Sequence, residues 1–280
     1  MALSKKKFLF LWAPISVLTI LVVLGYKIYK RLDMPSERKH SLRYFKAMTF
    51  SSKEYARGLP YRIFVPAGYD EKQHYPLILY LHGGGGRGND NTQQLDVGPI
   101  SLAKKSSVSD TPFIVLAPQC PSSRKWMDKY VAAPPYLNHN QDKYPESDIV
   151  KAIIKLIEHT SRTYSVDKRR LYISGFSMGA TGVWDIITRH PDMFAAAVIL
   201  SGENDPSKGY KLVDMPIWAF HGQLDGIAPV ENTRKMIDSI RANQGKKIKY
   251  TEYPDSGHGI NEQVYRNEPI VEWLLTHKLP

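Results

Sequence analysis

Beyond residue 43, short apolar runs alternate with polar stretches that contain turn residues or show helical periodicity. The runs LILYL, FIVLA, LYIS, AAAVIL and IWAF are almost wholly apolar. Such runs are typical of strands that are covered on both faces of a sheet. The pattern predicts strands at residues 44–50, 61–65, 77–81, 113–117, 170–174, 195–200, 217–221 and 248–253.

The clearest helical pattern covers residues 148–163, where isoleucines recur on one face behind Ser147 and Asp148 as cap candidates. Further helices are predicted over residues 230–244 and 270–278. Strands that alternate with helices indicate an α/β fold, with a mostly parallel central sheet and helices on both faces.

The N-terminus carries an apolar segment without charge, residues 8–25 (FLFLWAPISVLTILVVLG), with lysines on both sides. About 20 such residues cross a membrane as a helix. We therefore expect residues 1–31 to be an uncleaved signal anchor with a transmembrane helix. Residues 32–42 would be a linker, and residues 43–280 one folded domain on the periplasmic or extracytoplasmic side. One alternative is a cleaved signal peptide and a secreted protein, although the apolar region of a signal peptide is normally shorter, ~7–15 residues. A buried helix is the other alternative.

The positive charge of the chain is concentrated at the same end. Residues 1–40 contain eight basic and two acidic residues, and thus carry +6 of the net charge of +11. The other basic residues are scattered, unlike the basic patch of a nucleic-acid-binding protein, so we expect no nucleic-acid partner. The single cysteine, Cys120, excludes a disulfide framework within the chain, and the histidines show no metal-ligand spacing, so we expect no metal.

The sequence G-F-S-M-G at residues 175–179 stands directly after an apolar strand and before a helix-compatible stretch. A G-x-S-x-G motif at such a turn lifts its serine clear of the sheet, and the following helix directs its N-terminal N–H groups to the same point. Ser177 is therefore the predicted nucleophile. The alternative is an ordinary serine in a glycine-rich turn.

A serine hydroxyl becomes a good nucleophile only when a histidine removes its proton, and a carboxylate must orient that histidine. Asp225 follows the apolar strand IWAFH, and His258 follows the predicted strand at 248–253. Both lie just past the carboxyl end of a strand, the edge at which open α/β sheets build their sites. We expect Asp225 and His258 to complete a Ser-Asp-His triad, with Asp255 and Glu231 as fallback acids.

Glycines dominate the loop at residues 82–88 (HGGGGRG). Such a loop can present backbone N–H groups to the oxyanion of an acyl-transfer intermediate, together with the N–H of Met178. The expected donor from the loop is Gly84 or Gly85. The loop also matches the G-x-G-x-x-G pattern of dinucleotide sites, but the next residues are polar and do not begin an apolar helix, so we expect no dinucleotide to bind there.

Five motifs carry a family resemblance: LHGGGGRG, LAPQC, GFSMGATG, HGQLD and GHG. With them the chain resembles α/β-hydrolases of the esterase branch, which includes feruloyl esterases, polyhydroxybutyrate depolymerases and phospholipase/carboxylesterase-like enzymes. The resemblance implies the α/β-hydrolase fold and a cofactor-free serine hydrolase that acts on small-molecule or carbohydrate-linked esters. The chain departs from secreted members in its unpaired Cys120, since those members often carry disulfides.

Substrate contacts are expected in the 27-residue connection at residues 121–147, because long connections in compact domains are usually functional. Its aromatic side chains could stack on a sugar ring or a phenolic acyl group. Trp126 and Tyr130 are the candidate substrate-binding residues, and Tyr136 and Tyr144 lie in the same connection. The alternative is that these side chains pack the connection onto the domain.

Two other functions are compatible with the motifs. A serine peptidase of the prolyl-oligopeptidase type would use the same catalytic groups, with a charged pocket for a peptide terminus. A tethered, non-catalytic binding module could share the scaffold, because a fold does not determine a function. The complete set of catalytic residues argues against the binding module.

Overall fold

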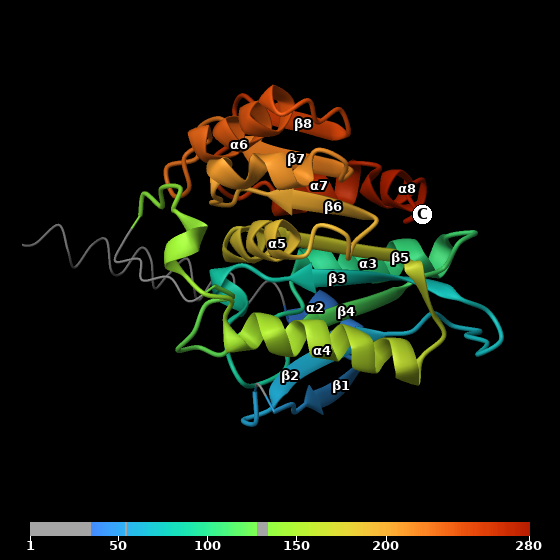
Figure 1. The fold of residues 1–280 in the computed structure, drawn as a ribbon. Coiled ribbons are helices and arrows are strands. Elements are labelled where there is room, and N and C mark those ends of the chain that lie inside the picture. The colour runs from blue at the N-terminus through green and yellow to red at the C-terminus, as the bar shows by residue number, and fades with distance from the viewer. Residues whose placement is uncertain (1–34, 54, 128–133) are drawn as a thin grey trace, which may run out of the picture. The chain divides into compact units, whose positions relative to one another are not determined.

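The computed structural model describes residues 35–53, 55–127 and 134–280. Residues Ser41–Pro280 form one compact unit built on an eight-stranded sheet in the order β1-β2-β4-β3-β5-β6-β7-β8 (Figure 1). The strands are β1 (Phe45–Phe50), β2 (Leu59–Phe64), β3 (Tyr75–Leu81), β4 (Ile114–Pro118), β5 (Val166–Phe176), β6 (Ala196–Leu200), β7 (Ile217–Gly222) and β8 (Ile248–Tyr253). All eight strands predicted from the sequence are present.

Most of the sheet is parallel. The strands from β4 and β3 through β8 pair in parallel, while β2 pairs antiparallel with both β1 and β4. The predicted apolar runs form the buried centre of this sheet; every residue of β3, for example, is buried. The expectation of a mostly parallel α/β sheet is confirmed.

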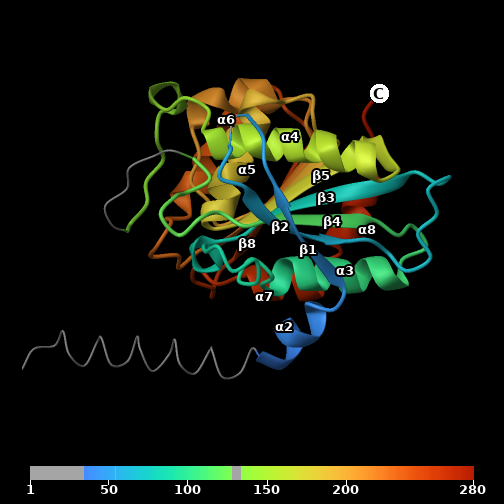
Figure 2. The ribbon, with the colours of Figure 1, turned by 90° about the horizontal axis from the view of Figure 1, so that it is seen from below.

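Helices cover both faces of the sheet (Figure 2). One face carries α4 (Asp148–Thr163), α5 (Met178–Arg189) and α6 (Glu231–Ala242), and the other carries α3 (Val97–Val108), α7 (Asn261–Asn267) and α8 (Ile270–Leu275). Accordingly, the buried side chains form two hydrophobic clusters, one on each face. Three short 3₁₀ helices, η1 (Gly84–Gly86), η2 (Gln141–Lys143) and η3 (Pro206–Leu212), lie in loops.

Helix α4 shows why the local sequence forms these elements. It begins and ends where the isoleucine pattern predicts, and the Ser147 side chain caps it by accepting a hydrogen bond from the N–H of Val150 at 3.1 Å. Its apolar face, including Ile149 and Ile153, is buried against the sheet. Burial of one face and a capped N-terminus together fix the helix.

The N-terminal expectations concern residues that are mostly outside the described part of the chain. The predicted transmembrane segment lies in residues 1–31, which the structure does not describe. Among the described residues, none of the helices is both long and apolar enough to span a bilayer. Within the predicted linker, Pro35–Ser41 form the short helix α2.

Candidate active site

Ser177 lies in the turn between β5 and α5 with a backbone φ of 56° and ψ of −120°. A positive φ is strained for a residue with a side chain, and such strain is found mainly at functional positions. The neighbouring glycines make the turn possible: a Cβ on Gly175 would lie 2.6 Å from the carbonyl carbon of Gly179, and one on Gly179 would lie 1.9 Å from the carbonyl oxygen of Leu81. The Ser177 N–H donates to the carbonyl of Leu200, which ties the turn to the end of β6.

His258 joins Ser177 to Asp225. Its Nε2 lies 2.7 Å from Ser177 Oγ, and its Nδ1 lies 2.7 Å from Asp225 Oδ2. Because a carboxylate can only accept, Nδ1 carries the ring proton and the bare Nε2 accepts the serine O–H. The order of donors and acceptors is therefore the one in which a histidine can remove the proton of the serine.

Asp225 is buried in the loop after β7, and all its hydrogen bonds stabilise the charged form. Oδ1 accepts from the N–H groups of Ile227 and Ala228 at 2.8 and 2.9 Å, and Oδ2 accepts from His258 and, at 3.1 Å, from His221 Nε2. Burial alone would raise the pKa of Asp225, but the hydrogen bonds from His221, His258 and Ala228 hold it well below its ordinary value. The acid is thus ionised over the range in which proteins are stable.

The fallback acids are not needed in this arrangement. Asp255 and Glu231 are both exposed, and Glu231 is ion-paired with Arg234 at 3.3 Å. The described part of the chain contains no group of three histidine, cysteine or acidic side chains that could hold a metal ion.

Two of the expected oxyanion donors border the same cavity as Ser177. Gly84 begins η1 and Met178 begins α5, and both line the cavity. The first N–H groups of a helix have no acceptor inside that helix, so they are available to a ligand. Gly85 is exposed and is not among the lining residues.

Hydrogen bonds of the buried His82 and Trp126 side chains hold the glycine loop in place. His82 Nε2 accepts the N–H of Cys120 at 3.0 Å, its Nδ1 donates to the carbonyl of Gly83 at 2.6 Å, and the Trp126 indole N–H donates to the carbonyl of His82 at 3.0 Å. A Cβ on Gly86 would lie 2.5 Å from His82 Nδ1. The ring of His82 therefore supports the loop from inside the domain.

This packing corrects the expectation for Trp126. The side chain is fully buried, at 0% exposure, with its ring 4.9 Å from that of His82. It packs the connection 121–147 onto the domain and cannot stack on a substrate. The other candidate, Tyr130, lies outside the described residues.

Tyr136 is the aromatic residue of this connection that the structure brings to the site. It lines a cavity of about 110 Å³ together with Ser177, Met178 and Gly84. Arg87, Lys125, Glu203, Thr181, Ser201, Met127 and Ala228 complete the lining. The cavity therefore contains charged groups of both signs as well as apolar side chains.

Sequence reasoning did not single out Ser201 or Glu203. Ser201 has a positive φ of 53°, is 1% exposed, and its hydroxyl has no hydrogen-bond partner among the described residues. Both residues follow β6 at the carboxyl edge of the sheet, so the rule that located Asp225 and His258 also applies to them. They could not be predicted as site residues because no recognisable sequence motif marks this strand end.

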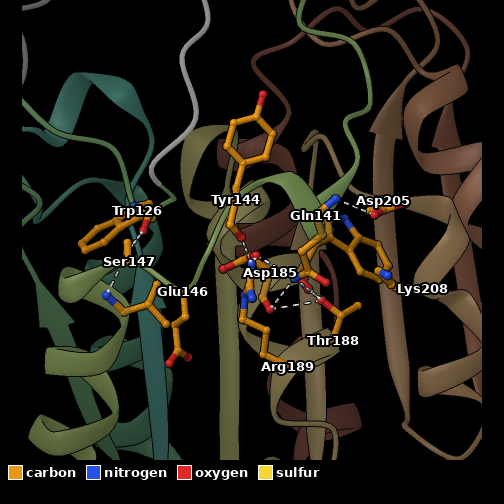
Figure 3. A network of polar contacts seen from close by, with 12 residues as sticks. Trp126, Gln141, Tyr144, Glu146, Ser147, Asp185, Thr188, Arg189, Asp205 and Lys208 are labelled. Atoms are coloured by element: carbon orange, nitrogen blue, oxygen red, sulfur yellow. Dashed lines mark hydrogen bonds and ion pairs between the residues drawn. The ribbon is translucent and has the colours of Figure 1, made fainter.

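A buried polar network fixes the connection that carries Tyr136 (Figure 3). The side-chain amide of Gln141 donates to Asp185 Oδ1 at 2.6 Å and to Thr188 Oγ1 at 2.9 Å, both on α5. Its backbone N–H donates to Asp205 Oδ2 at 2.6 Å, and Arg189 donates to the carbonyl of Tyr144 at 2.6 Å. The connection is thereby attached to the helix that follows the nucleophile.

Comparison with protein families and with curated proteins places these features in context. The model of a family described as putative esterase matches residues 52–255. The chain is 29% identical over 140 residues to feruloyl esterase B of Thermothelomyces thermophilus, and 22% identical over 253 residues to dipeptidyl-peptidase 4 of Giardia intestinalis. These alignments cover 50% and 76% of the chain but only 43% and 32% of the two relatives, so the chain spans less than half of their length.

Solved structures show the same architecture. A thermostable esterase is 34% identical, with a TM-score of 0.76 over 85% of this chain and 64% of its own. A ferulic acid esterase from Anaeromyces mucronatus is 17% identical, with a TM-score of 0.57 over 79% of this chain and 86% of its own, and it shows a shared fold.

Proposed function

Because the chain belongs to the family of putative esterases, we propose that it hydrolyses carboxylic esters through an acyl-enzyme intermediate on Ser177. The α/β-hydrolase fold expected from the sequence motifs is confirmed by its match to the thermostable esterase. The observation that carries the mechanism is the chain of contacts from Ser177 Oγ through His258 to Asp225, with both distances at 2.7 Å.

In the proposed reaction, Ser177 Oγ attacks the ester carbonyl carbon while His258 Nε2 takes the serine proton. The N–H groups of Met178 and Gly84 stabilise the resulting oxyanion. When the carbon–oxygen bond to the alcohol breaks, His258 gives its proton to the leaving alcohol. Water then attacks the acyl-enzyme with His258 as base, which releases the acid and restores Ser177. Asp225 holds His258 in the required tautomer throughout.

The substrate class follows from relatives and from the cavity lining. The feruloyl esterase relative supports an ester with an aromatic acyl or carbohydrate part, for which Tyr136, in place of Trp126, would be the contacting aromatic. The dipeptidyl-peptidase relative and the acidic residue Glu203 in the cavity lining favour a second candidate, a serine peptidase. No cofactor is needed for either reaction.

A single set of assays tests the proposal. The protein should hydrolyse p-nitrophenyl acyl esters or feruloyl esters faster than aminoacyl p-nitroanilides, and a fluorophosphonate probe should label it. Ser177→Ala should lose turnover by about 10⁴-fold or more and lose labelling, because no acyl-enzyme can form. Ser123→Ala, an exposed serine, is the matched control. Labelling that persists in Ser177→Ala would locate the nucleophile elsewhere.

We further propose that the apolar N-terminal segment tethers the domain to a membrane, with the domain on the periplasmic or extracytoplasmic side. The proposal rests on the uncharged run at residues 8–25 and on the basic residues around it. Protein that stays in the membrane pellet after high-salt and carbonate washes would support the tether. A mature protein that begins near Tyr26 and is found in a soluble fraction would contradict it.

A further inference from the structure

Some of the large apolar side chains that are exposed to solvent belong to loops that border the cavity. Among the described residues, seven such side chains are exposed, and three of them come from two loops next to the cavity: Leu137 (63% exposed), Leu224 (67%) and Ile227 (40%). We call these three residues the apolar rim. Single exposed apolar residues are ordinary, but a group of them at a binding site is not.

Each rim residue is adjacent in sequence to a residue of the site. Leu137 follows Tyr136 and Ile227 precedes Ala228, both of which line the cavity, and Leu224 precedes Asp225. The two loops that carry the exposed apolar rim are therefore the loops that supply Tyr136, Ala228 and Asp225 to the site. Figure 1 shows that both loops lie at the same end of the sheet.

A hydrogen bond joins these two loops, and two more attach the loop after β7 to the surroundings of the catalytic residues. The N–H of Tyr136 donates to the carbonyl of Ile227 at 2.7 Å, and the N–H of Ile227 donates to Asp225 Oδ1 at 2.8 Å. The N–H of Leu224 donates to the carbonyl of Ser256 at 2.9 Å, two residues before His258. The rim is thus a preformed surface attached to the same backbone that positions the acid and the base.

The cavity itself is too small for a large substrate. Its volume of about 110 Å³ is below the roughly 300–1,000 Å³ of pockets that enclose drug-sized ligands. An ester whose carbonyl reaches Ser177 must therefore leave any longer substituent outside the cavity. Two of the residues that line the cavity, Tyr136 and Ala228, are chain neighbours of rim residues, so the rim is the exposed apolar surface that such a substituent can reach from these loops.

We propose that the apolar rim binds the part of the ester that extends out of the cavity, so that the preferred substrates carry a long apolar group, such as a medium-length acyl chain. The proposal rests on the esterase function proposed above, and it specifies the group of the ester that lies outside the cavity, which the comparison with relatives leaves open. Each methylene that is moved from water onto apolar side chains contributes up to about a fourfold increase in kcat/KM. The enzyme should therefore favour p-nitrophenyl octanoate over p-nitrophenyl acetate when both are monomeric in solution.

The decisive measurement is the octanoate-to-acetate ratio of kcat/KM in the triple variant Leu137→Ser/Leu224→Ser/Ile227→Ser. We expect this ratio to fall about tenfold relative to the parent protein. The matched control is Tyr44→Ser/Met48→Ser/Val108→Ser. It also removes three exposed apolar side chains: Tyr44 precedes β1, Met48 lies in β1 and Val108 ends α3. An equal ratio in the rim variant and the control would overturn the proposal.

A second readout does not depend on turnover. The apolar fluorophore 1-anilinonaphthalene-8-sulfonate should bind to the parent protein and the control, and bind several-fold more weakly to the rim variant. If no ester is hydrolysed while this loss of binding is observed, the esterase proposal fails and the apolar site stands; equal binding in all three proteins would overturn it. If the rim variant instead converts a dimer into a monomer in sedimentation, the rim is an interface between copies of the chain, which also overturns the proposal.

Discussion

His221 Nε2 lies 3.1 Å from Asp225 Oδ2, the same carboxylate oxygen that contacts Nδ1 of His258. His221 is fully buried, and its Nε2 also lies 2.7 Å from the carbonyl oxygen of Ala228. Because both of these oxygens can only accept, Nε2 carries the ring proton and shares it between them, while Nδ1 accepts the hydroxyl proton of Thr233 at 2.7 Å. Each carboxylate oxygen of Asp225 thus accepts two hydrogen bonds. Burying a charged carboxylate without these donors would cost free energy of folding. With them, Asp225 stays ionised and keeps one orientation.

This arrangement predicts that Asp225→Asn lowers kcat by about 10³–10⁴-fold with little change in KM. An amide at this position can donate to His258 Nδ1, which would place the ring proton on Nε2 and leave no base for Ser177. Steady-state kinetics on a soluble ester measure the effect. Asp255→Asn is the control, because this carboxylate is exposed, and it should stay within twofold of the parent protein. The opposite ranking would transfer the role to Asp255.

The sheet could be predicted from sequence because its strands are buried on both faces and thus read as unbroken apolar runs. The helices were harder to predict from the sequence than the strands. Helix α4 has a clear apolar stripe, whereas α3 begins with V-G-P-I-S-L, where apolar residues show no stripe before the lysines. Helix α7 is only seven residues long, too short for a helical period to stand out.

In the site, too, residues with a clear local pattern could be predicted from the sequence, and residues placed by tertiary contacts could not. Ser177, Asp225 and His258 follow strand ends within motifs, so the sequence predicts their place, and the structure brings them within hydrogen-bond distance. Trp126 could not be placed because an aromatic residue in a long connection contacts either a substrate or the core, and only the tertiary contact with His82 distinguishes the two. Residues that line a cavity from different loops, such as Tyr136, have no local signature.

The close contacts at the nucleophile turn predict a large stability loss for Gly179→Ala. Alanine is normally the better helix residue, by about 1 kcal/mol. Here its Cβ would lie 1.9 Å from the carbonyl oxygen of Leu81, and backbone on both sides would have to move. We expect unfolding free energy to fall by about 3 kcal/mol or more in urea denaturation. Gly226→Ala, where a Cβ meets open space, should change it by less than about 1 kcal/mol.

The buried His82 predicts a loss of stability in weak acid. Burial lowers its pKa to about 4, although the hydrogen bond to the carbonyl of Gly83 opposes this shift. The unfolded chain binds the proton near its ordinary pKa of about 6.5, so between these values the unfolded state holds more protons and stability falls as the pH falls. This residue alone should reduce the unfolding free energy by about 2 kcal/mol between pH 7.5 and pH 5.

Urea denaturation at the two pH values measures this effect, with His82→Gln expected to show a flatter pH dependence. His74→Gln, which changes an exposed histidine, should keep the pH dependence of the parent protein. If His82→Gln does not fold, an NMR titration of the parent protein gives the same information. A ring that titrates near pH 6.5 in the folded protein would contradict the prediction.

The position of Tyr136 over the cavity depends on Asn232, which is buried in α6. The side-chain amide of Asn232 donates to the carbonyl of Tyr136 at 2.7 Å and accepts the N–H of Asn138 at 3.1 Å. Its backbone carbonyl accepts from the side chains of Asn138 and Asn204 at 3.2 and 2.9 Å. Asn232 thus joins the connection that carries Tyr136 to the loop that follows β6.

Asn232→Ala should therefore raise KM for esters by roughly threefold to tenfold and change kcat little, since Asn232 has no contact with Ser177 or His258. The substitution removes the side chain that pairs with the Tyr136 carbonyl and the Asn138 N–H, at a cost of about 1–3 kcal/mol of stability. Because general destabilisation could imitate this result, the test is a double-mutant cycle: in a Tyr136→Ala background, Asn232→Ala should no longer change KM. Asn243→Ala, an exposed asparagine at the end of α6, should leave KM unchanged in both backgrounds. A KM effect of Asn232→Ala that persists without Tyr136 would mean that the contact does not act through this side chain.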